Sequence, residues 1–183
     1  MKAVVVYESM YGNTHLVADA IGQGLSALYD VDVVPIDRVD PRLLDGADLI
    51  VVGGPTHAHG MSRSSTREAA VEQARKPDSD LTLDSDAEGP GLRDWFDSLP
   101  RLTGRAAAFD TRVDMPAVLT GRASKGIHRR LRQHELQLAA EPESFLVTKD
   151  NDLKPGEADR ARKWAEQLTR QLAPDGGSSA HHT

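Results

Sequence analysis

A polar turn with the sequence SMYGNT, residues 9–14, directly follows the apolar run of residues 3–6. Ser9 and Thr14 carry hydroxyl groups, Asn13 carries an amide, and Gly12 gives the backbone conformational freedom. Apolar residues at helical spacing begin directly after the turn. Free N–H groups at a helix start attract an anion. The turn lacks the lysine of a nucleoside-triphosphate loop and the G-x-G-x-x-G of dinucleotide sites. We therefore expect a neutral site for a phosphate monoester, with helix capping alone as the alternative.

Two other polar turns could share this site. PTHAHGM, residues 55–61, and DTRVDMP, residues 110–116, each follow a short apolar run. In a parallel sheet, ligands bind beyond the carboxyl ends of the strands, where the strand order reverses. The three turns are therefore expected to meet at one edge of the sheet.

The rest of the chain has the pattern of alternating strands and helices that such a sheet needs. Strands are predicted at 2–7, 31–37, 49–52, 106–109 and 141–149, with the third stopped abruptly by Gly53, Gly54 and Pro55. Helices are predicted at 17–28, 41–44, 66–74, 92–99, 119–136 and 155–172. This order predicts an α/β fold, a doubly wound parallel sheet with helices on both faces. We expect one domain over 1–173, an acidic and partly irregular insert at 62–91, and a disordered tail at 174–183.

Composition excludes several classes of function. The 183 residues include no cysteine, which excludes disulfides, thiolate metal sites and thiol catalysis, so redox chemistry would need a bound cofactor. A formal net charge of −6 argues against nucleic-acid binding. No stretch of the sequence suggests a signal peptide or a membrane span, so we expect a cytoplasmic protein without a membrane partner.

Two charged segments stand out. The insert carries five acids between 78 and 88 without a base among them, which indicates a solvated loop or, alternatively, a docking surface for basic partners. Within 119–136, Arg122, Lys125, Arg129 and Arg132 share one side of the predicted helix, which we interpret as a solvated face.

The sequence SMYGNT after the first strand resembles the phosphate loop of the flavodoxin family, and VVGGPTHAHG resembles that family's second flavin loop. PTHAHGMSR, FDTR and LTGRASKGI are similar to flavodoxin-like proteins of actinobacteria. The resemblance spans residues 1 to about 172 and implies a five-stranded sheet ordered 2-1-3-4-5 with bound FMN. By this resemblance, the residues that hold the phosphate are Ser9, Met10, Tyr11, Gly12, Asn13 and Thr14. Those near the isoalloxazine ring are Pro55, Thr56, His57, Ala58, His59 and Gly60 on one side and Asp110, Thr111 and Arg112 on the other.

The chain departs from flavodoxins in the two ring-binding loops, which contain no aromatic residue to stack on the flavin. We therefore expect a more open flavin site. His57 and His59 are the candidate catalytic residues, since an imidazole near a reduced flavin can donate a proton or stabilise its anion. Metal binding by this pair and simple hydrogen bonding to the loop are the alternatives, and no metal site is predicted because a third ligand is not evident.

Three functions follow from these features. The first is an FMN redox protein that passes electrons between protein partners, the acidic insert attracting partners with basic docking surfaces. The second is an FMN-dependent oxidoreductase acting on a small molecule such as a quinone or a porphyrinogen. The third is a flavodoxin-like binding module without flavin. The intact turn at residues 9–14, which we name the phosphate turn, counts against the third. We expect the first function, with the second as the alternative.

Overall fold

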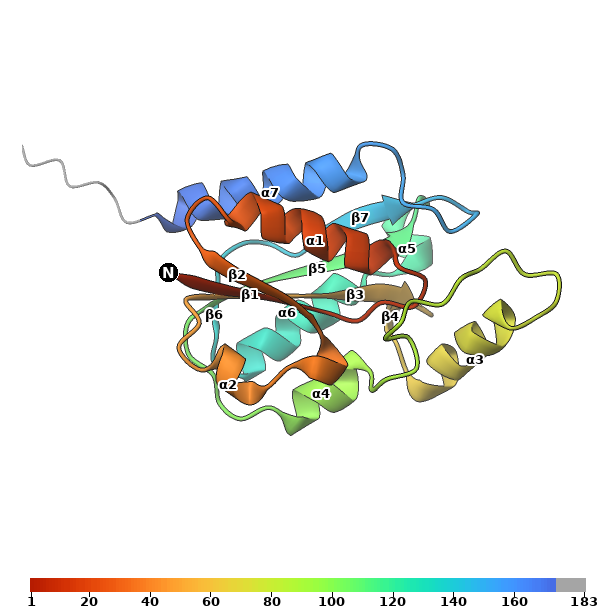
Figure 1. The fold of residues 1–183 in the computed structure, drawn as a ribbon, viewed down its shortest axis with the longest axis horizontal. Coiled ribbons are helices and arrows are strands. Elements are labelled where there is room, and N and C mark those ends of the chain that lie inside the picture. Colours follow the sequence, from red (N-terminus) through yellow and green to blue (C-terminus); the bar gives the residue numbers. More distant parts are fainter. Residues whose placement is uncertain (174–183) are drawn as a thin grey trace, which may run out of the picture.

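A parallel sheet forms the centre of the computed structural model, which describes residues 1–173 (Figure 1). The strands lie in the order β2-β1-β3-β5, and β6 and β7 both pair with the outer side of β5. Their bounds are β1 (Lys2–Tyr7), β2 (Asp30–Pro35), β3 (Leu49–His57), β4 (Gly60–Met61), β5 (Arg105–Val113), β6 (Gln137–Leu138) and β7 (Glu143–Val147). The tail predicted at 174–183 lies outside the described residues.

This sheet has the predicted α/β architecture, with two differences in detail. The predicted order 2-1-3-4-5 is present when β5 is counted as the fourth strand and β6 with β7 as the fifth. The fifth strand is divided because residues 139–142, which include Pro142, interrupt its pairing with β5. A short antiparallel strand, β4, is added where the chain folds back on β3. Seven strands therefore take the place of the expected five.

Helices cover both faces of the sheet (Figure 1). They are α1 (Asn13–Leu25), a short 3-10 helix η1 (Ile36–Arg38), α2 (Pro41–Leu44), α3 (Ser64–Ala74), α4 (Leu92–Ser98), α5 (Ala117–Thr120), α6 (Ala123–Gln133) and α7 (Glu157–Leu172). Helices α1 and α7 pack on one face, and α2, α4 and α6 on the other. Alternate residues of β1 supply the two cores, since Val4 and Val6 face α4 and α6 whereas Val5 faces α1. Trp95 and Phe96 lie in the first of these cores.

Strand β3 is longer than predicted. Gly53, Gly54 and Pro55 continue the strand to His57, and the prediction that they stop it was wrong. A Cβ atom at Gly53 would lie 2.1 Å from Cζ of Phe109, so glycine is needed there to let the ring pack on the strand. Strand β1 ends opposite Gly53, so Pro55 pairs only with β5 and its missing N–H is tolerated.

The helix predicted at 119–136 is two helices. Gly121 separates α5 from α6 and has a φ of 71°. A Cβ atom at this position would lie 2.2 Å from the carbonyl oxygen of His59, so the chain turns here against the β3–β4 hairpin. Helix α6 consequently starts at Ala123, beside the carboxyl ends of β3 and β5.

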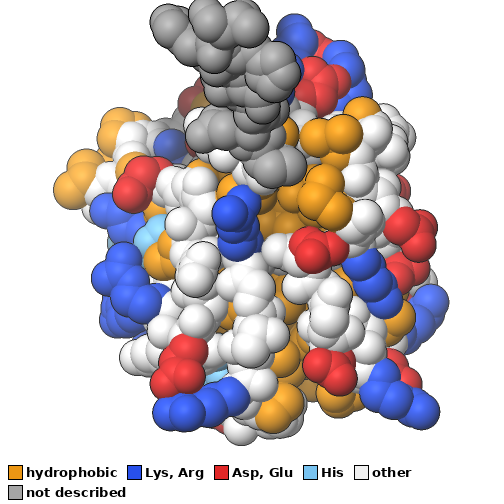
Figure 2. Space-filling view, turned by 90° about the vertical axis from the view of Figure 1, so that its left-hand side faces the viewer, with side chains coloured by type: hydrophobic (Ala, Val, Ile, Leu, Met, Phe, Trp, Pro, Cys, Tyr) orange, Lys and Arg blue, Asp and Glu red, His pale blue; other side chains and the backbone are white. Residues whose placement is uncertain are grey.

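The insert at 62–91 contains one helix, α3, followed by turns and irregular chain. Figure 1 shows α3 and the loop after it projecting beyond the end of the sheet at which β3 and β4 meet. Figure 2 views the other end of the molecule, where β1 begins, and there acidic and basic side chains are both spread over the surface. Among the helices of residues 1–173, none combines the length and apolar character that crossing a bilayer requires.

Candidate functional site: a cleft at the carboxyl ends of the strands

The three polar turns do meet at one cleft, which we name the loop cleft. Its volume is about 140 Å³, and it lies at the carboxyl ends of β1, β3 and β5. The residues that line it are Met10, Tyr11, Asn13, Thr14, Pro55, Thr56, His57, Thr111, Arg112, Val113, Val147 and Asn151. Of the predicted cofactor residues, Ser9, Gly12, Ala58, His59, Gly60 and Asp110 are not among them. The cleft is narrower than the open site expected from the missing aromatic residues.

The turn before α1 presents hydrogen-bond donors toward this end of the molecule. Helix α1 begins at Asn13, and no side chain caps its first turn, so the N–H groups there have no acceptor from a capping residue. Gly12, with a φ of 93°, donates its own N–H to Oγ of Ser9 at 3.1 Å. The helix start and the dipole of a 13-residue helix together favour an anion.

Two hydrogen bonds join the turn to the other walls of the cleft. The hydroxyls of Thr14 and Thr111 lie 2.8 Å apart, and both residues are buried. The Asn13 amide donates to the backbone carbonyl of Asn151 at 2.7 Å. A hydroxyl can donate one hydrogen bond while it accepts another, so Thr14 can keep Thr111 as a donor and still donate to a ligand.

The insert holds the phosphate turn from outside. Tyr11 donates its hydroxyl hydrogen to the carbonyl of Ala70 in α3 at 2.9 Å, and the N–H of Asp84 donates to the carbonyl of Met10 at 2.8 Å. Buried Glu8 accepts from Ser62 Oγ and from the N–H of Leu92. The insert is thus joined to the turn through Ala70 and Asp84, and its first residue, Ser62, contacts Glu8 just before the turn.

The hairpin of β3 and β4 separates the two histidines. His57 pairs with Gly60 across a two-residue turn of Ala58 and His59, whose φ angles are 42° and 74°. His57 lines the loop cleft, whereas His59 and Gly60 line a different cavity described below. Within residues 1–173, no group of three potential metal-ligating side chains is brought together.

Two of the predicted cofactor residues support the start of α6. Asp110 is fully buried, and its Oδ2 accepts from the N–H of Ser124 at 2.7 Å, while its Oδ1 has no partner among the described residues. The Thr56 hydroxyl accepts from the N–H of Ala123 at 3.0 Å. These contacts attach α6 to β3 and β5 close to the loop cleft.

Burial shifts the ionisation of three groups around the site. It lowers the pKa of His57, and the positive charge of Arg67 lowers it further, so this imidazole is neutral at physiological pH. Burial raises the pKa of Asp110 and of Glu8, more than the hydrogen bonds that each carboxylate accepts lower it. The cleft therefore has the neutral imidazole of His57 on one wall, and the poorly solvated carboxyl group of Asp110 lies behind another.

Comparison with known proteins agrees with this geometry. The family model described as flavodoxin matches residues 5–88, which contain the phosphate turn and the hairpin. Residues 5–88 belong to the flavodoxin family. A comparison with curated protein sequences finds no match.

Solved flavodoxins share the fold of this flavodoxin-like chain over nearly its full length. Flavodoxin 1 from Bacillus cereus is 20% identical, with a TM-score of 0.65, over 94% of this chain and 100% of that one. A flavodoxin from the domain Archaea is 21% identical, with a TM-score of 0.62, over 93% and 98%. The flavodiiron protein from Giardia intestinalis is 19% identical, with a TM-score of 0.60, over 93% of this chain and 36% of that one.

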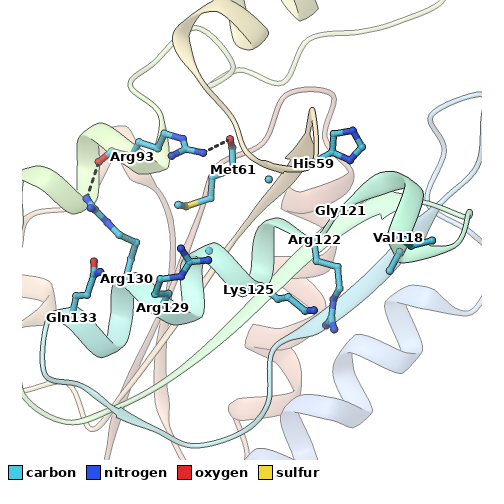
Figure 3. Close-up of a pocket in the computed structure, with 13 residues that line it drawn as sticks. His59, Met61, Arg93, Val118, Gly121, Arg122, Lys125, Arg129, Arg130 and Gln133 are labelled. Atoms are coloured by element: carbon cyan, nitrogen blue, oxygen red, sulfur yellow. Dashed lines mark hydrogen bonds between the residues drawn. The ribbon is translucent and has the colours of Figure 1, made fainter.

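A second, larger cavity lies on the other side of the hairpin of the flavodoxin-like chain, and we name it the basic cavity (Figure 3). Its volume is about 790 Å³. The residues that line it are His59, Gly60, Met61, Arg93, Ala117, Val118, Gly121, Arg122, Lys125, Gly126, Arg129, Arg130 and Gln133. Lys125 and Arg129 are exposed, as expected of a solvated face, but with Arg122 they also form a cavity wall, whereas Arg132 does not.

Three residues that line the loop cleft were not among the residues predicted to bind the cofactor. Val113 ends β5, Val147 ends β7, and Asn151 lies in the turn that follows β7. The turn KDND at 149–152, directly after an apolar run, was the available signal for Asn151, because it ends a strand at the same edge of the sheet as the other turns.

Proposed function

We propose that this flavodoxin-like protein binds FMN at the loop cleft and passes electrons between protein partners. The observation that supports it is the meeting of the phosphate turn with residues 55–57 and 111–112 at the start of α1. When bound, FMN would supply one- or two-electron transfer, which the chain's own side chains cannot provide.

The phosphate end of FMN suits the donors of the turn. The first N–H groups of α1 have no capping side chain, and the hydroxyl of Thr14 and the amide of Asn13 stand beside them. No lysine or arginine is needed, because a helix start and neutral donors bind a phosphate monoester.

The loop cleft is small for the isoalloxazine ring of FMN. The loop cleft, at about 140 Å³, is smaller than the roughly 300–1,000 Å³ typical of small-molecule pockets. It therefore encloses part of a flavin rather than the whole molecule. The flat side chains that line it are Tyr11 and His57, with Pro55 and Arg112 beside them.

His57 is the proposed proton-handling residue. It lines the loop cleft and is neutral at physiological pH, so a ring nitrogen can accept a proton or a hydrogen bond there. His59 belongs to the basic cavity. The flavin midpoint potential should therefore change its pH dependence in His57→Ala and keep it in His59→Ala. Equal behaviour of the two variants would remove the assignment.

The acidic insert supplies the proposed attraction to partners. Asp78, Asp80 and Glu88 are exposed on it, and it projects beyond the end of the sheet that holds the cleft. Electron transfer to a basic partner should slow as salt increases, because screening weakens steering. Association rates independent of ionic strength would contradict this part of the proposal.

Titration of the purified protein with FMN, followed by flavin fluorescence, tests the function directly. We expect micromolar or tighter binding of FMN and weaker binding of riboflavin, which lacks the phosphate. If neither binds, the chain is a flavodoxin-like binding module instead. The second candidate, an FMN-dependent oxidoreductase acting on a small molecule, is favoured by the basic cavity beside the hairpin.

A further inference from the structure

The basic cavity is formed where three parts of the chain meet. The β3–β4 hairpin supplies one wall, α4 supplies Arg93, and α5, α6 and the two residues between them supply the rest. Figure 3 shows Arg129 projecting from α6 toward Met61, whereas the side chains of Lys125 and Arg122 turn away from the hairpin. All three residues line the same cavity.

Positive charge in this cavity is not balanced by its own lining. Five of the lining residues are Lys or Arg, and none is Asp or Glu. Arg130 pairs with Asp97 outside the lining. Among the residues that the structure describes, Arg93 and Arg122 donate only to carbonyl or hydroxyl oxygens, which are neutral. The side chains of Lys125 and Arg129 make no hydrogen bond or ion pair within residues 1–173.

In helix α7, by comparison, acidic side chains neutralise the basic ones. There Arg160 pairs with Glu157, Arg162 with Glu166 and Lys163 with Asp159. Residues 115–134, by contrast, hold five Lys or Arg and no acid, although the whole chain has a net charge of −6. Like charges held together repel one another, and a bound anion relieves that repulsion.

The size and the other lining residues limit the kind of anion. A volume of about 790 Å³ lies within the roughly 300–1,000 Å³ typical of small-molecule sites. Met61, Ala117 and Val118 add apolar surface next to the cations, which suits an organic body. Guanidinium groups bind phosphate and carboxylate through paired hydrogen bonds.

We propose that the basic cavity binds a small organic molecule carrying at least two phosphate or carboxylate groups. The site is separate from the loop cleft, since the hairpin lies between them, with His57 on one side and His59 on the other. The proposal does not depend on FMN binding, and for the oxidoreductase alternative it names the class of small molecule.

Calorimetric titration with pyrophosphate and with citrate at fixed ionic strength tests the site, because neither probe contains a flavin. The variant Lys125→Gln/Arg129→Gln removes two cavity cations. Its matched control, Arg132→Gln/Arg170→Gln, removes the same charge from exposed positions outside the lining. We expect submillimolar binding that the cavity variant weakens by more than about tenfold and the control by less than about twofold.

Each outcome decides the proposal. Tighter binding of pyrophosphate or of citrate, lost only in the cavity variant, supports it and identifies the acid group that the site prefers. Equal losses in the two variants would show general charge attraction and overturn it, as would absence of binding of both probes. A loss of pyrophosphate binding in Thr14→Val as large as in the cavity variant would place the ion at the phosphate turn and also overturn it.

Discussion

The hydrogen bond between Thr14 and Thr111 allows the phosphate contact to be tested separately from the fold. The Thr14 hydroxyl has two hydrogen-bond partners in the proposed complex, the Thr111 hydroxyl at 2.8 Å and the FMN phosphate. Within the described chain, the Thr111 hydroxyl has only Thr14 as its partner there. Replacing Thr14 by valine keeps the shape and removes a hydrogen bond to a charged group, worth about 1.5–3 kcal/mol. FMN affinity should therefore fall by about 10- to 150-fold.

The comparison variant is Thr111→Val, which breaks the same threonine pair but leaves the Thr14 hydroxyl free for the phosphate. In Thr111→Val, the affinity for FMN should change by less than about threefold. In Thr14→Val, the affinity for riboflavin should also change by less than about threefold. Each single variant leaves one buried hydroxyl without a partner, at a cost of about 1–3 kcal/mol of unfolding free energy. The double variant should be nearly as stable as the wild type, since both polar groups are gone.

Fluorescence titration with FMN and riboflavin, together with urea unfolding of the four proteins, measures these quantities. If Thr14→Val weakens riboflavin as much as FMN, the hydroxyl does not contact the phosphate. If Thr111→Val weakens FMN as much as Thr14→Val, the threonine pair only supports the turn. Either result would refute the reasoning.

Three other predictions concern the hairpin and the buried acid. Ala58→Asn/His59→Gly should raise the unfolding free energy by about 1–3 kcal/mol, because two residues with positive φ are replaced by the pair that this turn prefers, and an unchanged urea midpoint would contradict the strain. Gly121→Ala should lower it by about 1–3 kcal/mol, since the new Cβ meets the His59 carbonyl, and an unchanged melting temperature would contradict that contact. The folded-state pKa of Glu8 is raised, so its contribution to stability is present below its unfolded pKa of about 4.3 and is lost as pH rises through the folded value. Urea unfolding across this range should therefore show the stability of the wild type falling relative to Glu8→Gln as pH rises, and a constant difference would refute it.

Much of the loop cleft could be predicted from the sequence because its parts are local. A polar turn between a buried strand and a helix is visible as residues 9–14, and the parallel order brings such turns to one edge. The placement of His57 in the loop cleft and of His59 in the basic cavity could not be predicted, because it depends on the β3–β4 hairpin. Gly53, Gly54 and Pro55 indicated the end of a strand, whereas the packing of Phe109 on Gly53 lets the strand continue.

The basic cavity could not be predicted from the sequence for a different reason. Helical periodicity shows that Arg122, Lys125 and Arg129 share a face, but not whether solvent or another element lies in front of it. The opposing wall comes from Arg93 and from the hairpin, about 30 and 60 residues away along the chain. The break at Gly121, which orients α6 toward that wall, depends on a contact with His59.

The hydrogen bond between Asn13 and Asn151 has a consequence for the order of events during synthesis. It closes a loop of 138 residues, so the phosphate turn is made early and its partner emerges only when most of the chain has left the ribosome. Helices α1 and α7 pack together on the same face, and α7 is completed later still. A ligand that needs all walls of the loop cleft can therefore bind only after Asn151 has reached the turn before α1. Its capture would report that the strands from β1 to β7 have assembled.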